Sequence, residues 1–162
     1  MRATDYPYCQ SPFTVLAHRG GAGMAVNKGI ENTLAAFGHA VEVGCTYLET
    51  DVHATSDGVL VAFHDPILDR VTESGGVIAA MPWHKVKQAK VGGEPIPTLD
   101  EIFDAFPEAF INIDIKHDGA TMPLIDVLSR HRAWSRVCVG SFSSKRIQTF
   151  RRLVQGRTAT AV

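Results

Sequence analysis

Short apolar runs alternate with amphipathic segments along most of this 162-residue chain, and this alternation limits its possible folds more than any other feature. Each apolar run is rich in valine, isoleucine, leucine or phenylalanine and has the length of a buried strand. Strands that alternate with helices favour a parallel β/α sheet. The strands expected from this pattern lie within residues 13–17, 47–65, 109–115, 137–142 and 157–162, the last being the start of a further unit.

Helix-capping residues separate these runs. The pair Asn32-Thr33 offers an N-cap for a helix that runs to about Val43, because an asparagine or threonine side-chain oxygen can accept a hydrogen bond from a free N–H group of the first turn. Thr98 and Glu101 have the spacing of a capping box, which predicts another helix from that point. Further helices are expected at 121–134 and from Ser143 or Ser144 to about Gly156.

Residues 47–65 read as two strands joined by the turn Ser56-Asp57-Gly58. Glu49 and Asp51 are two residues apart, so on a strand they point to the same side. A hairpin centred near Asp57 sets them opposite residues 63–66, next to His64. Two carboxylates beside a histidine predict either a metal site or a proton-transfer site.

Polar groups also follow or interrupt two other expected strands. His18-Arg19-Gly20-Gly21 comes directly after the run 13–17, at the strand end where α/β proteins place their chemistry. The run 109–115 alternates strictly and sets Asn112 and Asp114 on one face. A carboxylate on an inner strand face is costly without a partner, which makes Asp114 a candidate third ligand.

Residues 67–97 have a weak pattern interrupted by several glycines and prolines. We expect a small, partly irregular insertion here, with one short helix at 83–89. Such an insertion can shape a substrate pocket or cover the edge of a barrel.

Charge and cysteine content narrow the function further. A formal charge of -1 gives no general attraction to nucleic acid or anionic membranes. Cys9, Cys45 and Cys138 are odd in number and lack metal-type spacing, which argues against a disulfide framework. No apolar run approaches the roughly 18 residues of a membrane span, and the polar start does not resemble a signal peptide. These features predict a cytoplasmic location.

Doubly wound sheets and (β/α)8 barrels both fit this order of elements. The sequence Gly20-Gly21-Ala22-Gly23 lacks the following Lys-Ser/Thr of a nucleotide phosphate loop. Polar residues at the ends of several successive strands favour the barrel.

Several short motifs, in order along nearly the whole chain, together resemble the glycerophosphodiester phosphodiesterase family. No single motif is specific, but their combination and order are. The motifs are His18-Arg19-Gly20, Glu31-Asn32-Thr33-Leu34-Ala35-Ala36-Phe37, Glu49-Thr50-Asp51-Val52, Thr55-Ser56-Asp57-Gly58, His64-Asp65, Pro97-Thr98-Leu99, Asn112-Ile113-Asp114-Ile115-Lys116 and Ser141-Phe142.

The resemblance implies a TIM-type (β/α)8 barrel and a hydrolase of lipid and glycerol metabolism. It implies that His18 and His64 act as an acid/base pair and that Arg19 binds phosphate, with Lys116 approaching the phosphate or the metal-bound oxygens. Glu31 would orient Arg19 or contact substrate, or it would merely interact with the dipole of the following helix. The implied ligands of a divalent cation, Mg²⁺ or Ca²⁺, are Glu49, Asp51 and Asp114.

The chain departs from the family pattern in three respects. Asp114 stands where the family more often has glutamate. Ile30 stands where the family usually has proline. A complete barrel of this type needs about 250 residues, so we expect residues 1–162 to form a single barrel domain, incomplete through C-terminal truncation.

The resulting hypothesis is metal-dependent hydrolysis of glycerophosphodiesters to sn-glycerol 3-phosphate and an alcohol. Two alternatives stay open: a phospholipase-type lyase that forms a cyclic phosphate, and a non-catalytic phosphate-binding fragment. The expected partner is a small-molecule substrate. Neither a nucleic-acid partner nor a membrane-spanning segment is expected, and self-association stays open.

Overall fold

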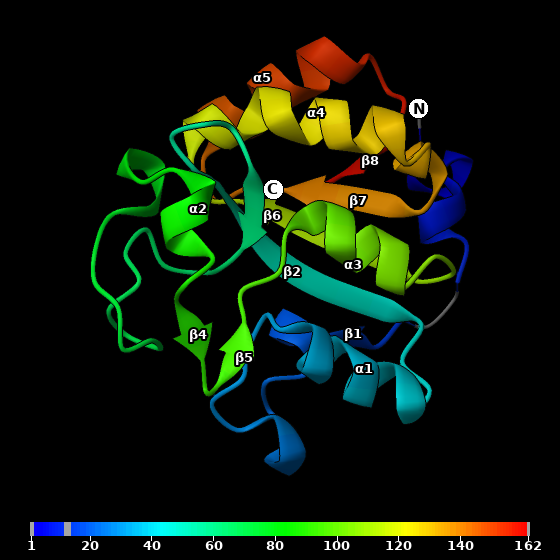
Figure 1. Ribbon diagram of the computed structural model, residues 1–162. Helices are drawn as coiled ribbons and strands as arrows, with labels where there is room; N and C mark the ends of the chain where they lie inside the picture. Colours follow the sequence, from blue (N-terminus) through cyan, green and yellow to red (C-terminus); the bar gives the residue numbers. More distant parts are fainter. Residues whose placement is uncertain (1, 12–13, 162) are drawn as a thin grey trace.

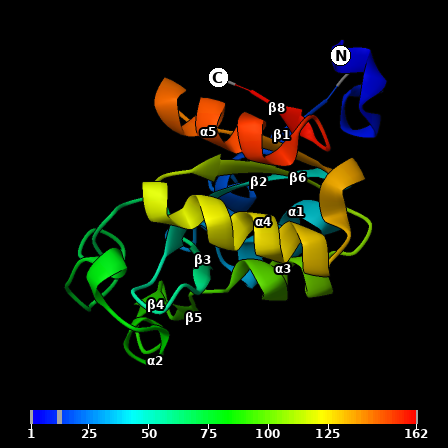
Figure 2. The ribbon, with the colours of Figure 1, turned by 90° about the horizontal axis from the view of Figure 1, so that it is seen from above.

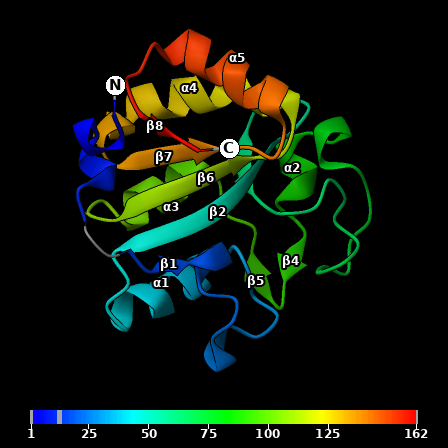
Figure 3. The same ribbon diagram turned by 180° about the vertical axis from the view of Figure 1, so that it is seen from behind.

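Five parallel strands lie in chain order in a six-stranded sheet of the computed structural model, which describes residues 2–11 and 14–161. Figure 3 shows them side by side, with β1 and β8 at the two edges. Sequential parallel pairing is how a β/α barrel begins, and the predicted α/β class is confirmed. The strands are β1 (Leu16–Ala17), β2 (Tyr47–Ala54), β6 (Phe110–Ile115), β7 (Val137–Gly140) and β8 (Ala159–Thr160).

Helices connect these strands and cover the outer face of the sheet (Figures 1 and 2). The hydroxyl groups of Thr33, Thr98 and Ser143 each accept a first-turn N–H group, as predicted. Each such cap stabilises its helix by about 1 kcal/mol. The helices are α1 (Leu34–Glu42), α3 (Leu99–Ala105), α4 (Thr121–Arg130) and α5 (Ser144–Val154).

The third of these helices is shorter than predicted. It ends at Arg130, and a separate 3-10 turn, Ala133–Ser135, follows it. Arg132 between them has φ 50, a left-handed conformation that no α-helix can contain. The predicted helix over 121–134 is therefore wrong in its last turn.

Alternation along β6 gives the sheet two different faces. Ile111, Ile113 and Ile115 are fully buried against the helices. Asn112 and Asp114 point to the opposite, inner face and line a cavity there. The predicted division of this strand into an apolar and a polar face is confirmed.

Tyr8 packs against the amino-terminal ends of the strands. Its ring meets Tyr47 and Phe110 edge-on, with centroids 5.2 and 6.0 Å away. The Tyr47 hydroxyl donates to the Tyr8 carbonyl over 2.9 Å. The segment before β1 thus covers the end of the sheet opposite to the polar strand ends. The predicted strand 13–17 is seen only at Leu16–Ala17, and Phe13 lies outside the described residues.

The predicted hairpin is present. β3 (Leu60–Ala62) pairs antiparallel with the end of β2. The chain then forms the predicted insertion, which contains α2 (Trp83–Val86), β4 (Lys90–Val91) and β5 (Glu94–Pro95). Its helix ends at Val86, three residues before the predicted end. A small apolar cluster anchors the insertion to the hairpin, and it includes Val61, Phe63, Leu68, Ile78, Val86, Val91 and Ile96.

Two further predictions concern disulfide bonds and membrane-spanning segments. Cys9, Cys45 and Cys138 are free thiols. None of the helices within residues 2–11 and 14–161 combines the length and hydropathy needed to cross a bilayer.

Candidate active site

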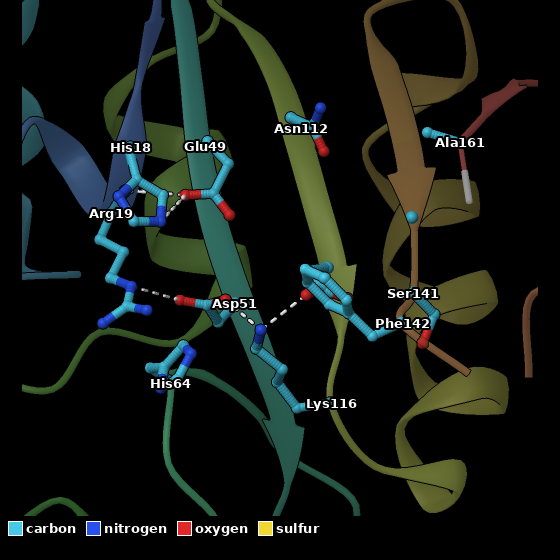
Figure 4. A pocket seen from close by; sticks show the side chains of 12 residues that line it. His18, Arg19, Glu49, Asp51, His64, Asn112, Lys116, Ser141, Phe142 and Ala161 are labelled. Carbon is cyan, nitrogen blue, oxygen red and sulfur yellow. Dashed lines mark hydrogen bonds and ion pairs between the residues drawn. The ribbon is translucent and has the colours of Figure 1, made fainter.

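A cavity of about 380 Å³ opens at the carboxyl ends of the parallel strands (Figure 4). All the predicted site residues except Glu31 line it, although they come from segments nearly 100 positions apart in the sequence. Glu31 lies behind Arg19 instead. The lining residues are His18, Arg19, Glu49, Asp51, His64, Asn112, Asp114, Lys116, Gly140, Ser141, Phe142 and Ala161.

Strand register brings the acidic residues together. Glu49 pairs with Asn112 and Asp51 pairs with Asp114 across β2 and β6. Parallel strands in register set such side chains on one face at the same height. The ammonium group of Lys116 lies between two of them, 2.9 Å from Asp51 Oδ1 and 2.6 Å from Asp114 Oδ2.

Glu49 is held by the loop that follows β1. Its Oε2 accepts the backbone N–H of Arg19 over 2.8 Å and lies 3.9 Å from His18 Nε2. Burial and the nearby charge of Asp51 raise the pKa of Glu49 to about 7. Glu49 therefore holds its proton more readily than an exposed glutamate does.

Arg19 reaches the cavity from a strained backbone. It has φ 49, and Gly20 and Gly21 after it also have positive φ, a region that only glycine enters at no steric cost. Its guanidinium group contacts Glu31 Oε1 at 3.2 Å and lies 3.5 Å from Asp51 Oδ2. Because its side chain is only 20% exposed, the guanidinium group is held at the edge of the cavity.

His64 is held by its neighbour Asp65. The distance from His64 Nδ1 to Asp65 Oδ1 is 2.6 Å. Burial would raise the pKa of Asp65, but hydrogen bonds from Arg70 and His64 lower it overall. An ionised carboxylate only accepts hydrogen bonds, so we assign the proton to Nδ1. In the neutral ring, Nε2 is then free to accept a proton.

Asn32 supports Asp51, a role that sequence reasoning missed. Its Nδ2 donates to Asp51 Oδ2 over 3.1 Å, and its Oδ1 accepts the Thr50 hydroxyl over 2.9 Å. The backbone has φ 58, a left-handed conformation that asparagine tolerates better than most residues. The available signal was an asparagine just before a helix cap, which suggested only a second cap candidate.

His53 is a buried residue of the same hairpin as Asp51. It is two residues from Asp51, so on the strand it points to the same side, and it is 3% exposed. Its Nε2 lies 3.1 Å from the His64 carbonyl oxygen, so it contacts the backbone of a cavity residue.

The three predicted cation ligands fit a hard divalent ion by their chemistry. Carboxylate oxygens are the ligands that Mg²⁺ and Ca²⁺ prefer. Asp114 Oδ1 is buried without a hydrogen-bond partner, which leaves one acceptor on the acidic face available. Among residues 2–11 and 14–161, however, no three His, Cys, Asp or Glu side chains are arranged to hold a metal ion. Lys116 provides positive charge between two of the carboxylates instead.

Positively charged side chains lie beside these three carboxylates. The cavity therefore offers both acceptors for a metal ion and donors for an anion. Arg19 presents a planar guanidinium fork, whose geometry matches a phosphate group. His18 and His64 line the same cavity, and histidine is the side chain whose ordinary pKa lies nearest neutrality. This arrangement suits proton transfer at a bound phosphate ester.

Comparison with known proteins agrees with this geometry. The model of the glycerophosphoryl diester phosphodiesterase family matches residues 18–158. A probable glycerophosphodiester phosphodiesterase 2 from Mycobacterium tuberculosis is 38% identical over 147 residues, which cover 90% of this chain and 54% of that protein. A glycerophosphodiester phosphodiesterase from Caldanaerobacter subterraneus is 34% identical over 145 residues, covering 80% of this chain and 58% of that one.

A solved structure has the same fold. The phosphodiesterase OLEI02445 from Oleispira antarctica, solved with the product sn-glycerol-3-phosphate, superimposes with a TM-score of 0.82 at 28% identity. The match covers 95% of this chain and 66% of that chain. The chain thus spans a little over half the length of the two curated relatives. The open parallel sheet is the corresponding part of a TIM-type barrel.

Proposed function

This chain belongs to the glycerophosphoryl diester phosphodiesterase family, and we propose that the protein containing it hydrolyses glycerophosphodiesters to sn-glycerol 3-phosphate and an alcohol. One observation carries the proposal: His18, Arg19, His64 and Lys116 line one cavity together with Glu49, Asp51 and Asp114. The product bound by the Oleispira antarctica relative supports the choice of glycerol phosphate.

Charge neutralisation is the first requirement of this reaction, because a phosphodiester anion repels an attacking oxygen. In the proposal, Arg19 binds two phosphoryl oxygens through its guanidinium fork. Glu31 Oε1 contacts a guanidinium nitrogen of Arg19 at 3.2 Å and so helps to orient that fork. Lys116 adds positive charge at the carboxylate side of the cavity.

Proton transfer is the second requirement. One histidine of the pair His18 and His64 accepts the proton of the attacking hydroxyl. The other donates a proton to the oxygen of the leaving alcohol. If water attacks, the open monoester forms directly. If the neighbouring glycerol hydroxyl attacks, a cyclic phosphate forms first, and a water molecule must then open it with the two proton transfers reversed. Each transfer contributes typically about 10² to 10⁴-fold to the rate. The Asp65 contact supports an active role for His64 by holding its ring with Nε2 free.

A divalent cation, Mg²⁺ or Ca²⁺, completes the proposal. Glu49, Asp51 and Asp114 would hold it, and when bound it would neutralise charge on the phosphoryl oxygens. The buried Asp114 oxygen without a hydrogen-bond partner, on the same face as Glu49 and Asp51, supports a cation there. Asp114 is shorter than the usual glutamate, so its contact with the ion would run through water.

Domain organisation and location remain part of the proposal. We take residues 1–162 as belonging to one barrel domain, with a cytoplasmic location. The parallel sheet and the three free thiols are compatible with these assignments.

Phosphorus NMR of glycerophosphocholine tests the function directly. The purified protein is assayed as residues 1–162 and as its longest natural form, with Mg²⁺ or Ca²⁺ present. Hydrolysis gives the open monoester sn-glycerol 3-phosphate and choline. Accumulation of a cyclic phosphate would show a lyase instead, and an unchanged diester would reject catalysis of this substrate.

A further inference from the structure

Arg70, in the insertion after β3, lies between two carboxylates that contact residues of the cavity. Its Nε is 2.5 Å from Asp65 Oδ2, and its NH2 group is 2.5 Å from Glu31 Oε1. The third guanidinium nitrogen reaches Glu31 Oε2 at 3.4 Å. One planar side chain therefore links two loops that are 34 positions apart in the sequence.

Each of these carboxylates also holds a residue of the cavity. Asp65 binds His64 Nδ1 through its other oxygen, at 2.6 Å. Glu31 contacts the Arg19 guanidinium group at 3.2 Å. The chain of contacts therefore runs without a break from His64 to Arg19, through Asp65, Arg70 and Glu31.

The two carboxylates are held in a partly dry environment. The side chains of Glu31 and Asp65 are 17% and 19% exposed, whereas Arg70 is 45% exposed. Charge-assisted hydrogen bonds are roughly twice as strong as neutral ones, and a guanidinium fork fixes direction as well as distance. Without Arg70, Asp65 would have only His64 as its side-chain partner among these contacts.

The backbone around Arg70 is fixed before any ligand arrives. Leu68 is fully buried in the apolar cluster of the insertion, and its carbonyl accepts the Thr72 hydroxyl over 2.8 Å. The turn at Gly92 presses against the loop that carries Glu31, since a Cβ at Gly92 would lie 2.5 Å from the Gly29 carbonyl oxygen. The insertion thus holds Arg70 and the Glu31 loop against each other.

We propose that Arg70 is a positioning residue that fixes His64 and Arg19 relative to each other through Asp65 and Glu31. This inference rests on the proposed function, in which His64 moves a proton and Arg19 binds phosphate. It also gives the insertion a role: the segment supplies the side chain that connects the two functional groups.

Kinetics of Arg70→Ala on glycerophosphocholine test the inference. Residues that orient other functional side chains typically contribute about 10 to 100-fold to activity. Arg70→Ala should therefore lower kcat/KM by about that factor. Arg70→Lys should recover only part of the loss, because an ammonium group lacks the fork that contacts both carboxylates. The same substitution in a Glu31→Gln/Asp65→Asn background should cost less than about twofold, because coupled residues are not additive.

Arg130→Ala is the matched control. Arg130 binds Asp100 at 2.8 Å, and Asp100 also binds His131 at 2.8 Å. This is the same Arg-Asp-His arrangement on helices outside the cavity. The substitution Arg130→Ala should leave kcat/KM within about twofold of the wild-type value, while it changes the melting temperature as much as Arg70→Ala does.

A second readout needs no turnover. Nitrogen-15 NMR of the neutral His64 ring should find the proton on Nδ1 in the wild type. In Arg70→Ala it should find a mixture of both tautomers, because Asp65 loses the contact that holds its second oxygen and can rotate away from Nδ1. Unchanged kcat/KM in an active protein, or a fully multiplicative loss in the double-substituted background, would overturn the role of Arg70. If the wild type does not hydrolyse the diester, the proposed function fails, and an unchanged tautomer would then by itself overturn the role of Arg70.

Discussion

Asp51 and Asp114 are register partners on adjacent parallel strands, and they share one cation, the ammonium group of Lys116. The Asp51 side chain is 2% exposed and that of Lys116 is 17% exposed. Loss of one member of such a buried group leaves an uncompensated charge, at a cost of about 3 to 5 kcal/mol. The stability of this strand pair therefore depends on a positive charge between the two carboxylates.

Lys116→Met should lower the free energy of unfolding by about 3 kcal/mol in chelator, measured by urea denaturation. Mg²⁺ or Ca²⁺ should restore part of the loss, because an added cation can take the place of the missing ammonium group. Exposed Lys87 is the matched control, and Lys87→Met should change stability by less than about 0.5 kcal/mol. Equal effects of the two substitutions would contradict a shared-cation role for Lys116.

Chelation should suppress turnover. If Glu49, Asp51 and Asp114 hold a divalent cation during catalysis, excess chelator should lower kcat/KM at least tenfold, and added Mg²⁺ or Ca²⁺ should restore it. The rate is followed by release of sn-glycerol 3-phosphate. An unchanged turnover in excess chelator would contradict a role for a divalent cation in catalysis.

Asn32 should matter for activity more than for stability. Asn32→Gly removes the amide that holds Asp51 but keeps a residue that tolerates φ 58. We expect kcat/KM to fall about tenfold, as for other groups that orient a functional carboxylate. Asn32→Ala should lose the same activity and a further 1 to 2 kcal/mol or so of stability, because alanine is strained in this conformation.

Gln155 provides the control for the two Asn32 substitutions. It has φ 50 at the end of α5, away from the cavity. Gln155→Gly should leave kcat/KM unchanged. If Asn32→Gly behaved like Gln155→Gly, the hydrogen bond to Asp51 would have no functional role.

The Cys138 thiol should be inert at neutral pH. Burial is the main cause that raises its pKa to about 11. Since the thiolate is the reactive form, a disulfide reagent at pH 8 should modify half-buried Cys9 and Cys45 first and Cys138 only after denaturation. Equal rates for all three thiols in the native protein would contradict this prediction.

The same shift affects stability at alkaline pH. A raised pKa means that the folded protein binds the Cys138 proton more tightly than the unfolded chain does. This contribution is complete below pH 9, the ordinary value, and is lost as the pH rises towards 11. Cys138→Ser should therefore flatten the loss of stability over that interval, measured by thermal unfolding.

Much of the site could be predicted because strand alternation fixes where side chains point. The two-residue spacing of Glu49 and Asp51 and the strict alternation around Asp114 were enough to set three carboxylates on one inner face. Position at the end of a buried strand was enough to set His18 and Arg19 beside them. Local capping rules located the beginnings of α1, α3 and α5.

The supporting contacts could not be predicted because they depend on tertiary packing. Arg70 meets Glu31 across 39 positions, and no local pattern links the two. Lys116 was expected near the phosphate, and its distance of two residues from Asp114 was the one sign that it could also pair with that carboxylate.

Turnover of glycerophosphocholine by the double variant His18→Ala/His64→Ala measures what the two histidines contribute to catalysis. Its kcat/KM should be at least about 10²-fold below that of the wild type. His84→Ala, which changes an exposed histidine of α2, should keep full activity. A double variant that folds and hydrolyses the diester at the wild-type rate would show that His18 and His64 are not the acid/base pair.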